Sequence, residues 1–373
     1  MPPVVIDIRS AEDSRDVVHR AVQALVEGKL VALPTETVYG LAASALNASA
    51  VERLLATKQR SAGKALTLAI RGPDDVLDYL PRLSPLGRRL ARRCWPGPVT
   101  LVAEDCDPES LVRQLPPSVQ QAVAPGGTLG LRVPAHQMVL DILQMLVGPI
   151  VLTSANPQGG GDPVTAEEVL AALGDSVQLV LNDGQSRLGQ PSTVVKVNRN
   201  ALQILRPGVV SEQTLKRLSS LMILLVCTGN TCRSPMAEVM CRQMIADKLG
   251  CKPGDLGDHG VMVMSAGISA MLGARPSPEG VSVLSKMGLH LADHESQPLT
   301  TQLVRHADII WTMTRSHRQA IVNQWPEASA RTLVLSRDQS DIADPIGGPV
   351  ELYERCAQQI KGQLEHRIKD LEL

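Results

Sequence analysis

Phenylalanine is absent from the 373-residue chain, and aromatic residues of all kinds make up only 2% of it. Apolar residues still account for 44%, so leucine, valine, isoleucine, alanine and methionine must pack the cores. No apolar run is long enough to span a membrane. Asp7, Arg9 and Glu12 interrupt the N-terminus, which argues against a signal peptide.

The chain also lacks a strong net charge and a regular cysteine pattern. Its formal charge is −1, so any nucleic-acid binding would need a local basic patch. The seven cysteines are odd in number and scattered, which argues against a disulfide framework and for a reducing, cytoplasmic location. No Cys/His spacing matches a zinc site, so no protein-bound metal is expected.

The length exceeds one ordinary core, and two domains are expected. Apolar runs at 4–8 and 29–33 flank a helical pattern at 13–27, which is typical of an α/β protein. Residues 209–220 resemble a short polar helix capped by Ser211. We therefore predict a first domain at residues 1–210, a linker at 211–220 and a second domain at 221–373.

The second domain begins with an apolar run at 221–226, which predicts a buried parallel strand. The sequence Cys227-Thr-Gly-Asn-Thr-Cys-Arg-Ser-Pro follows, with Gly229 for a flexible loop and Ser234 as the expected helix start. Loop amides, a helix N-terminus and the guanidinium of Arg233 would form an anion cradle that holds Cys227 as a thiolate. The alternative is a buried structural cysteine followed by a chance arginine, but the strand–loop–helix context favours a nucleophile aimed at phosphorus.

Expected strands at 261–264, near 306–311 and at 333–335 complete a four-stranded, parallel, doubly wound sheet. Asp344 precedes Pro345 and is either the start of a turn or an acid for a leaving group. From residue 221 onward the sequence resembles the low-molecular-weight protein tyrosine phosphatase family, which includes arsenate reductases and bacterial protein-arginine phosphatases. The resemblance implies hydrolysis through a phosphocysteine, without a cofactor. It assigns catalysis to Cys227, Arg233 and Asp344, and support of the phosphate loop to Thr228, Gly229, Asn230, Thr231, Cys232 and Ser234.

Two features of this resemblance bear on the substrate and on redox behaviour. Thr231 stands where phosphotyrosine enzymes carry an aliphatic residue, and Ile346 offers no ring to stack on, so the arginine-phosphatase branch is favoured. Cys232 could form a protective disulfide with Cys227 or could be a silent loop residue. Arsenate reduction is disfavoured, because the remaining cysteines of this domain are expected in helices or a distant loop: Cys241, Cys251 and Cys356.

In the first domain, small polar and basic residues repeatedly follow expected strands, where α/β sheets bind ligands. One such stretch is Pro34-Thr-Glu-Thr-Val-Tyr-Gly, which could also be a local turn. Lys58, Arg60 and Lys64 form a basic loop that suits a polyphosphate, or that is simply solvated. Arg132 lies inside an apolar strand and needs a partner or a ligand, of which a ligand is favoured.

Eight motifs in a fixed order over residues 10–210 resemble the threonylcarbamoyl-AMP synthase family, whose YrdC-like fold is a twisted mixed sheet with flanking helices. They are Pro-Thr-x-Thr-Val-Tyr-Gly, Lys-x-Arg-x-x-x-Lys, Trp-Pro-Gly-Pro-x-Thr, Gly-x-Arg-x-Pro, Ser-Ala-Asn-Pro, Asp-Gly, Pro-Ser-Thr-Val and Arg-Pro-Gly. The resemblance implies that L-threonine, bicarbonate and ATP give threonylcarbamoyl-AMP and pyrophosphate, for the threonylcarbamoyladenosine of tRNA. It places threonine on Thr37, Arg132 and Ser192. It places ATP, with Mg²⁺ on the phosphates, on Lys58, Arg60, Lys64, Thr128, Ser154, Asn156 and Arg206.

The sequence departs from the synthase family at one position, and alternatives remain open for one arginine cluster and for the activity of each domain. Ala69 stands where some relatives carry a histidine near the threonine. Four arginines at helical spacing form a solvated helix face or an RNA-binding patch: Arg88, Arg89, Arg92 and Arg93. The first domain could accordingly be a double-stranded RNA or tRNA binding module without synthase activity, and the second a docking module for the tRNA-modification partner, without phosphatase activity. The favoured prediction is a bifunctional enzyme. Its expected partners are its small substrates, phosphorylated proteins, a tRNA-modification complex and, as a further candidate, tRNA; no membrane partner is expected.

Overall fold

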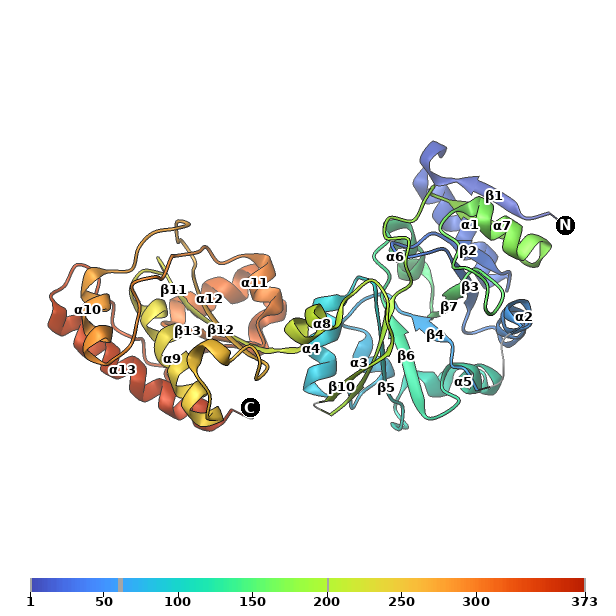
Figure 1. Cartoon of the computed structure of the whole chain (residues 1–373). Helices are drawn as coiled ribbons and strands as arrows, with labels where there is room; N and C mark the ends of the chain where they lie inside the picture. The colour runs from blue at the N-terminus through green and yellow to red at the C-terminus, as the bar shows by residue number, and fades with distance from the viewer. Residues whose placement is uncertain (1, 60–62, 200, 372–373) are drawn as a thin grey trace. The chain divides into compact units, whose positions relative to one another are not determined.

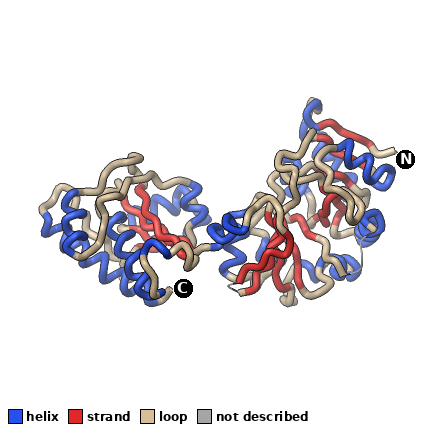
Figure 2. The backbone as a smooth tube through the Cα atoms, viewed as in Figure 1, coloured by secondary structure: helices blue, strands red, loops and turns tan. Residues whose placement is uncertain are grey.

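The computed structural model describes residues 2–59, 63–199 and 201–371. The chain divides into two compact units, Met1–Leu218 and Ser219–Leu373. Both are α/β, as the sequence predicts, and in each the strands lie at the centre with helices around them (Figure 2). Within the described residues, no helix has the length and apolar character needed to cross a membrane.

The first unit is built on a 10-stranded mixed sheet in the order β1-β8-β2-β3-β7-β4-β6-β5-β9-β10. Most of these strands are labelled in Figure 1. The sheet contains both parallel and antiparallel pairs; for example, β4 and β6 are parallel whereas β5 and β6 are antiparallel. The strands are β1 (Val4–Asp7), β2 (Val31–Leu33), β3 (Gly40–Ser44), β4 (Thr67–Ala69), β5 (Val99–Glu104), β6 (Thr128–Arg132), β7 (Ile150–Ser154), β8 (Leu179–Asn182), β9 (Thr193–Asn198) and β10 (Ala201–Arg206).

Helices cover this sheet on both faces. Because side chains alternate across a strand, Leu41 and Ala43 of β3 join a core under α2, α4, α5 and α7, whereas Ala42 joins a core under α1 and α6. The α-helices are α1 (Ser14–Val26), α2 (Ala48–Lys58), α3 (Val76–Tyr79), α4 (Pro85–Cys94), α5 (Pro117–Val123), α6 (Gln137–Met145), α7 (Ala166–Leu173) and α8 (Glu212–Ser219). Short 3₁₀ turns are η1 (Ile8–Ser10), η2 (Leu111–Gln114) and η3 (Gly174–Ser176). Trp95 and Tyr39 are the largest fully buried side chains here, and small aliphatic residues fill the rest.

Helix α8 forms where the sequence predicts a short polar helix, and the Ser211 hydroxyl accepts a hydrogen bond from the Thr214 amide at 3.2 Å. Its Leu215 is fully buried in the core of the first unit. Arg93 on α4 donates to the Leu218 carbonyl at 2.7 Å. The segment predicted as a linker therefore packs onto the first unit as far as Leu218, because the apolar side of α8 is buried in the core of that unit.

The second unit has the predicted four-stranded parallel sheet, in the order β12-β11-β13-β14. Its strands are β11 (Leu221–Cys227), β12 (Val261–Gly267), β13 (Ile309–Thr312) and β14 (Thr332–Val334). Alternate residues of β11 enter two cores, one under α9, α10 and α13 and one under α11 and α12. The helices are α9 (Arg233–Leu249), α10 (Pro278–Lys286), α11 (Thr301–His306), α12 (Arg315–Gln324) and α13 (Val350–Lys369), with the 3₁₀ turns η4 (Pro253–Asp255) and η5 (Pro326–Arg331).

Candidate functional sites

A cavity of about 500 Å³ in the first unit collects nearly all the residues that the motifs single out. Those that line it are Thr37, Lys58, Lys64, Thr128, Arg132, Ser154, Asn156, Ser192 and Arg206. Arg60, the remaining predicted ligand, lies outside the described residues. Ala69, the position of the missing family histidine, is fully buried in the core and is not among the lining residues.

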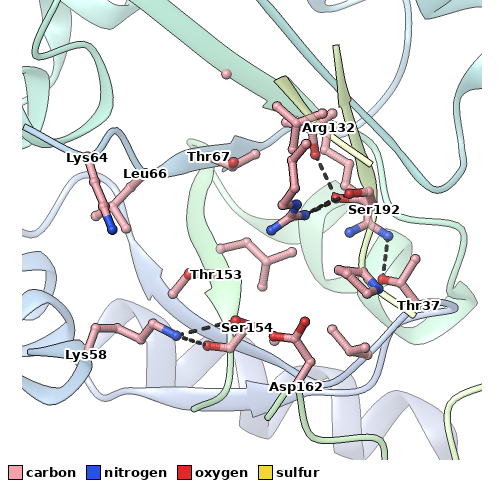
Figure 3. Close-up of a pocket in the computed structure, with 18 of the residues that line it drawn as sticks. Thr37, Lys58, Lys64, Leu66, Thr67, Arg132, Thr153, Ser154, Asp162 and Ser192 are labelled. Atoms are coloured by element: carbon pink, nitrogen blue, oxygen red, sulfur yellow. Dashed lines mark hydrogen bonds between the residues drawn. The ribbon is translucent and has the colours of Figure 1, made fainter. Parts of the chain in front are cut away.

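The cavity lies over a face of the sheet, whereas the sequence predicts a site at the carboxyl ends of strands. Alternate residues of β6, namely Thr128, Gly130 and Arg132, line it, while Leu129 and Leu131 point into the core on the other face. Arg132, Ser154 and Arg206 do stand at the ends of β6, β7 and β10, as predicted. The central strands are largely antiparallel, however, so these ends share no common carboxyl edge. Figure 3 shows Lys58 and Lys64 at one end of the cavity and Arg132, Ser192 and Thr37 at the other.

Lys58, Ser154 and Asn156 form one hydrogen-bonded cluster at the lysine end. The Lys58 ammonium comes from the last turn of α2 and is buried; it donates to the Ser154 carbonyl and to Asn156 Oδ1, each at 2.7 Å. The Ser154 hydroxyl also donates to Asn156 Oδ1, at 2.6 Å, and Asn156 Nδ2 donates to the Gly160 carbonyl. A buried ammonium with fixed acceptors is held ready for a further anionic partner, such as a phosphate.

Arg132 has a protein partner that the sequence analysis missed. Its Nη2 donates to Glu36 Oε1 at 2.8 Å and to the Thr37 hydroxyl at 2.9 Å, and both side chains of the ion pair are buried. Glu36 Oε2 in turn accepts from the Ala135 amide at 3.0 Å. The carboxylate fixes the orientation of the guanidinium while Arg132 still lines the cavity.

Arg206 and Ser192 form the wall next to Arg132. Arg206 Nη2 donates to the Ser192 carbonyl at 2.7 Å and lies 3.2 Å from its hydroxyl, which also contacts Thr100 Oγ1 at 3.0 Å. Burial lowers the pKa of Arg206, and Arg132 acts in the same direction, whereas Asp162 opposes the shift. Asp162 also lines the cavity and was not predicted. Two guanidinium groups near one space favour a bound anion there.

The second site lies at the end of β11. The Cys227 sulfur is 3.0 Å from the Ser234 hydroxyl and accepts from the Asn230 amide at 3.2 Å. Helix α9 begins at Arg233, one residue before the predicted start, and its N-cap residue Cys232 makes no side-chain capping bond. Ser234 is therefore not the N-cap; its hydroxyl faces the cysteine instead.

Asn230, and not Gly229, gives the phosphate loop its left-handed turn. Its φ is 53°, and its fully buried side chain donates to Ser234 Oγ at 2.9 Å and to Ser265 Oγ at 2.8 Å. These bonds offset the strain that a non-glycine residue meets at positive φ. Gly267 at the end of β12 allows the loop to approach, since a Cβ there would lie 2.4 Å from the Thr228 carbonyl.

Arg233 and Asp344 meet at this loop although they are 111 residues apart in the chain. Arg233 is buried, donates from Nη1 to the Ile342 carbonyl at 3.3 Å, and forms an ion pair with Asp344 through Nη2. The Asp344 side chain is 42% exposed, so it can reach both the loop and a substrate. A guanidinium and a carboxyl group beside a cysteine are the groups that phosphoryl transfer to sulfur and back to water needs.

Three of the other cysteines of this unit are buried, namely Cys232, Cys241 and Cys356, whereas Cys251 is partly exposed. The Cys232 sulfur lies 3.5 Å from the Tyr353 hydroxyl, and a disulfide between Cys227 and Cys232 stays a prediction. Burial raises the pKa of Cys356 to about 12 and raises the pKa of Cys241 further. Both are therefore thiols at neutral pH, and neither is suited to act as an additional nucleophile.

Two histidines beside the phosphate loop were not predicted. His317 Nε2 lies 2.9 Å from the Thr228 hydroxyl, and His294 Nε2 lies 2.9 Å from the Asn230 carbonyl. Both residues come from segments far from the loop in sequence, and no local motif marks them. Only the three-dimensional pairing of the elements brings them to the site.

Comparison with known proteins separates the chain into the same two parts. The family model described as telomere recombination matches residues 23–208, and the one described as low molecular weight phosphotyrosine protein phosphatase matches residues 222–372. A threonylcarbamoyl-AMP synthase of Pyrococcus abyssi is 34% identical over 195 residues, which are 52% of this chain and 54% of that protein. The chain thus spans about half the length of that relative.

Two further relatives are matched over most of their own length. A putative threonylcarbamoyl-AMP synthase of Mycobacterium tuberculosis is 36% identical over 204 residues, covering 54% of this chain and 88% of that protein. A protein-arginine-phosphatase of Bacillus subtilis is 33% identical over 153 residues, covering 40% of this chain and 95% of that protein. A solved structure of the Pyrococcus abyssi Sua5 protein is similar in fold, with a TM-score of 0.52 and 18% identity over 96% of this chain and 97% of that one.

Proposed function

Because the chain belongs to both the threonylcarbamoyl-AMP synthase family and the low-molecular-weight phosphotyrosine protein phosphatase family, we propose that it is a bifunctional enzyme with one active site in each unit. The first unit forms L-threonylcarbamoyl-AMP and pyrophosphate from L-threonine, bicarbonate and ATP. The second hydrolyses phosphorylated protein side chains through a phosphocysteine. The protein works in the cytoplasm and supplies threonylcarbamoyl-AMP to the transferase complex that modifies tRNA.

The synthase proposal depends most on one observation: a single cavity holds cations at both ends and hydroxyls between them. The threonine amine combines with bicarbonate, with loss of water, to give an N-carboxylate; this new carboxylate attacks the α-phosphorus of ATP, and pyrophosphate leaves. Both reactants are anions, so the reaction needs neutralisation and alignment more than acid–base groups. Lys58 and Lys64 bind the phosphates of ATP, and Arg132 with Thr37 and Ser192 binds the threonine.

We propose the remaining ATP contacts by position in the cavity. Thr128, Ser154, Asn156 and Arg206 contact the nucleotide. Arg60 is proposed as an ATP ligand from its Lys-x-Arg-x-x-x-Lys motif alone. Mg²⁺ is carried in on the ATP phosphates, which provide its preferred oxygen ligands, and Asp162 is a carboxylate within the cavity that can support it.

Pyrophosphate release by the full chain tests the synthase proposal. Release is expected only when threonine, bicarbonate and ATP are all present. Lys58→Ala is expected to lower the rate about a hundredfold, as removal of a fixed charge-stabilising donor does in other active sites. Cys227→Ser is the matched control, since it alters the other unit and should leave release unchanged. Binding of tRNA without any threonine-dependent release would instead support the RNA-binding alternative.

For the second unit, the proposal depends on the group formed by Cys227, Ser234, Arg233 and Asp344. The Cys227 thiolate attacks phosphorus, and the bond to the leaving atom breaks while Asp344 donates a proton to it. Asp344 then takes a proton from water, which attacks the phosphocysteine and releases inorganic phosphate. Arg233 binds two phosphoryl oxygens throughout. Hydrolysis that persists in Cys227→Ser would instead support the docking-unit alternative.

We propose phosphoarginine as the preferred substrate. Thr231 adds a hydroxyl beside the loop, and its backbone carbonyl is held by the Ser277 amide at 2.9 Å. Ile346 beyond Asp344 is 68% exposed and offers no aromatic ring for a tyrosine. Thr231→Ile should raise the turnover of phosphotyrosine relative to phosphoarginine, with Thr231→Ser as the control that keeps the hydroxyl. If the ratio of phosphotyrosine to phosphoarginine turnover is unchanged in Thr231→Ile, Thr231 does not set a preference for phosphoarginine.

A further inference from the structure

His317 makes a contact at the phosphatase site that no step of the proposed reaction uses. The ring comes from the first turn of α12, where the Thr314 hydroxyl caps the helix by accepting from the His317 amide at 3.2 Å. Its Nε2 lies 2.9 Å from Thr228 Oγ1. Thr228 directly follows Cys227 and is exposed, whereas His317 is only 7% exposed.

The other ring nitrogen of His317 is a second, independent observation. Nδ1 is buried and has no hydrogen-bond partner in the part of the chain that the structure describes. A buried N–H without an acceptor is among the rarest unsatisfied groups in proteins, whereas a bare ring lone pair is tolerated better. The proton of a neutral ring therefore belongs on Nε2, and Nε2 donates to Thr228 Oγ1.

Charge supports the neutral ring. Burial, and secondarily the Arg233 guanidinium, lower the pKa of His317 to about 4, although Asp344 and Asp341 act in the opposite direction. The ring therefore stays neutral at the pH values of most cells. Since the hydroxyl of Thr228 already accepts from Nε2, its own proton remains available to another acceptor.

Building on the proposed phosphatase function, we propose that His317 is a positioning residue that turns the Thr228 hydroxyl into a donor toward the oxyanion in the phosphate loop. Thr228 would then contact a phosphoryl oxygen and add one neutral hydrogen bond to the loop amides and to Arg233. The ring itself touches no substrate. With the opposite tautomer, the Thr228 proton would be spent on Nε2 and the loop would lose this donor.

A double-mutant cycle in the full chain tests the pairing. His317→Leu and Thr228→Val are each expected to lower kcat/KM for phosphoarginine about tenfold, and the double variant also only about tenfold, because the first leaves the Thr228 donor unoriented and the second removes it. His317→Gln keeps an N–H near Nε2 and Thr228→Ser keeps the hydroxyl, so both should remain within about twofold of the wild type. Gln319→Leu, at an exposed position of the same helix, is the matched control and should have no effect.

Tungstate binding separates this inference from the phosphatase function itself. The oxyanion affinity of the loop, measured against Arg233→Ala as the blank, should fall by the same factor in both single variants and not further in the double variant. If the wild type hydrolyses nothing but shows this pattern, the proposed function fails and the pairing stands. Losses that multiply in the double variant, or a loss in His317→Leu with none in Thr228→Val, would overturn the pairing and leave His317 a structural residue.

Discussion

The buried ion pair between Glu36 and Arg132 allows a sharp test of the synthase site. Both side chains are at least nine-tenths buried, with Glu36 Oε1 2.8 Å from Arg132 Nη2. Glu36→Ala leaves the guanidinium without a counter-charge and the Ala135 amide without its acceptor. Removing one partner of a buried pair destabilises a protein by about 3–5 kcal/mol, so the first unit should lose about that much.

The same pair predicts a reversal in the double variant. Replacing both charges by apolar groups removes the desolvation penalty together with the attraction, and such replacements are often neutral or stabilising. Glu36→Ala combined with Arg132→Met should therefore recover most of the stability lost in Glu36→Ala, giving a coupling of about 2 kcal/mol or more. Glu36→Gln, which keeps an acceptor for the amide, should fall between the wild type and Glu36→Ala.

Urea unfolding of the full chain, followed by fluorescence, is a suitable assay because Trp95 lies in the first unit whereas Trp311 and Trp325 lie in the second. Only the first-unit transition should move. The KM for threonine should rise in Glu36→Ala, since Arg132 loses its fixed orientation. A loss below about 1 kcal/mol in Glu36→Ala, or no recovery in the double variant, would refute the claim that Glu36 holds Arg132.

Three further predictions concern the second unit. Asp344→Asn should lower kcat about a hundredfold for phosphoarginine but less for an aryl phosphate whose leaving group needs no proton, which steady-state kinetics can compare. Gly267→Ala places a methyl group 2.4 Å from the Thr228 carbonyl, so phosphatase assays should show a loss while pyrophosphate release is unchanged. The pKa of His317 is lowered to about 4, so below pH 6.5 the unfolded chain binds a proton that the folded chain does not. Between about pH 6.5 and 5, urea titrations should show the wild type losing about 1 kcal/mol per pH unit more than His317→Gln.

Much of the fold could be predicted because apolar runs and caps are local signals. The run at 221–226 became β11, and the helical pattern at 13–27 became α1, with bounds that differ by a residue or two. Strand order is not local. The sequence therefore did not reveal that the first-unit cavity lies over a face of the sheet, because the order β7-β4-β6-β5 mixes strand directions.

In the candidate sites too, residues marked by local motifs could be predicted, whereas pairings between distant residues could not. The predicted ligand residues, apart from Arg60 outside the described range, do meet in one cavity, because the fold brings their helix, strand and loop positions together. Glu36 was missed although it lies inside a motif, since its pairing with Arg132 joins residues 96 positions apart. Gly229 was the obvious residue for a left-handed turn, yet Asn230 takes that conformation because distant Ser265 and Gln297 hold its side chain.

We propose two independent anion sites in one chain. The most direct test measures both activities in the same preparations of Lys58→Ala and Cys227→Ser full-length protein. Threonine-dependent pyrophosphate release should be lost in Lys58→Ala and kept in Cys227→Ser, and phosphoarginine hydrolysis should show the opposite pattern. Wild-type protein that releases no pyrophosphate in response to threonine, or Cys227→Ser protein that still hydrolyses phosphoarginine, would contradict this proposal.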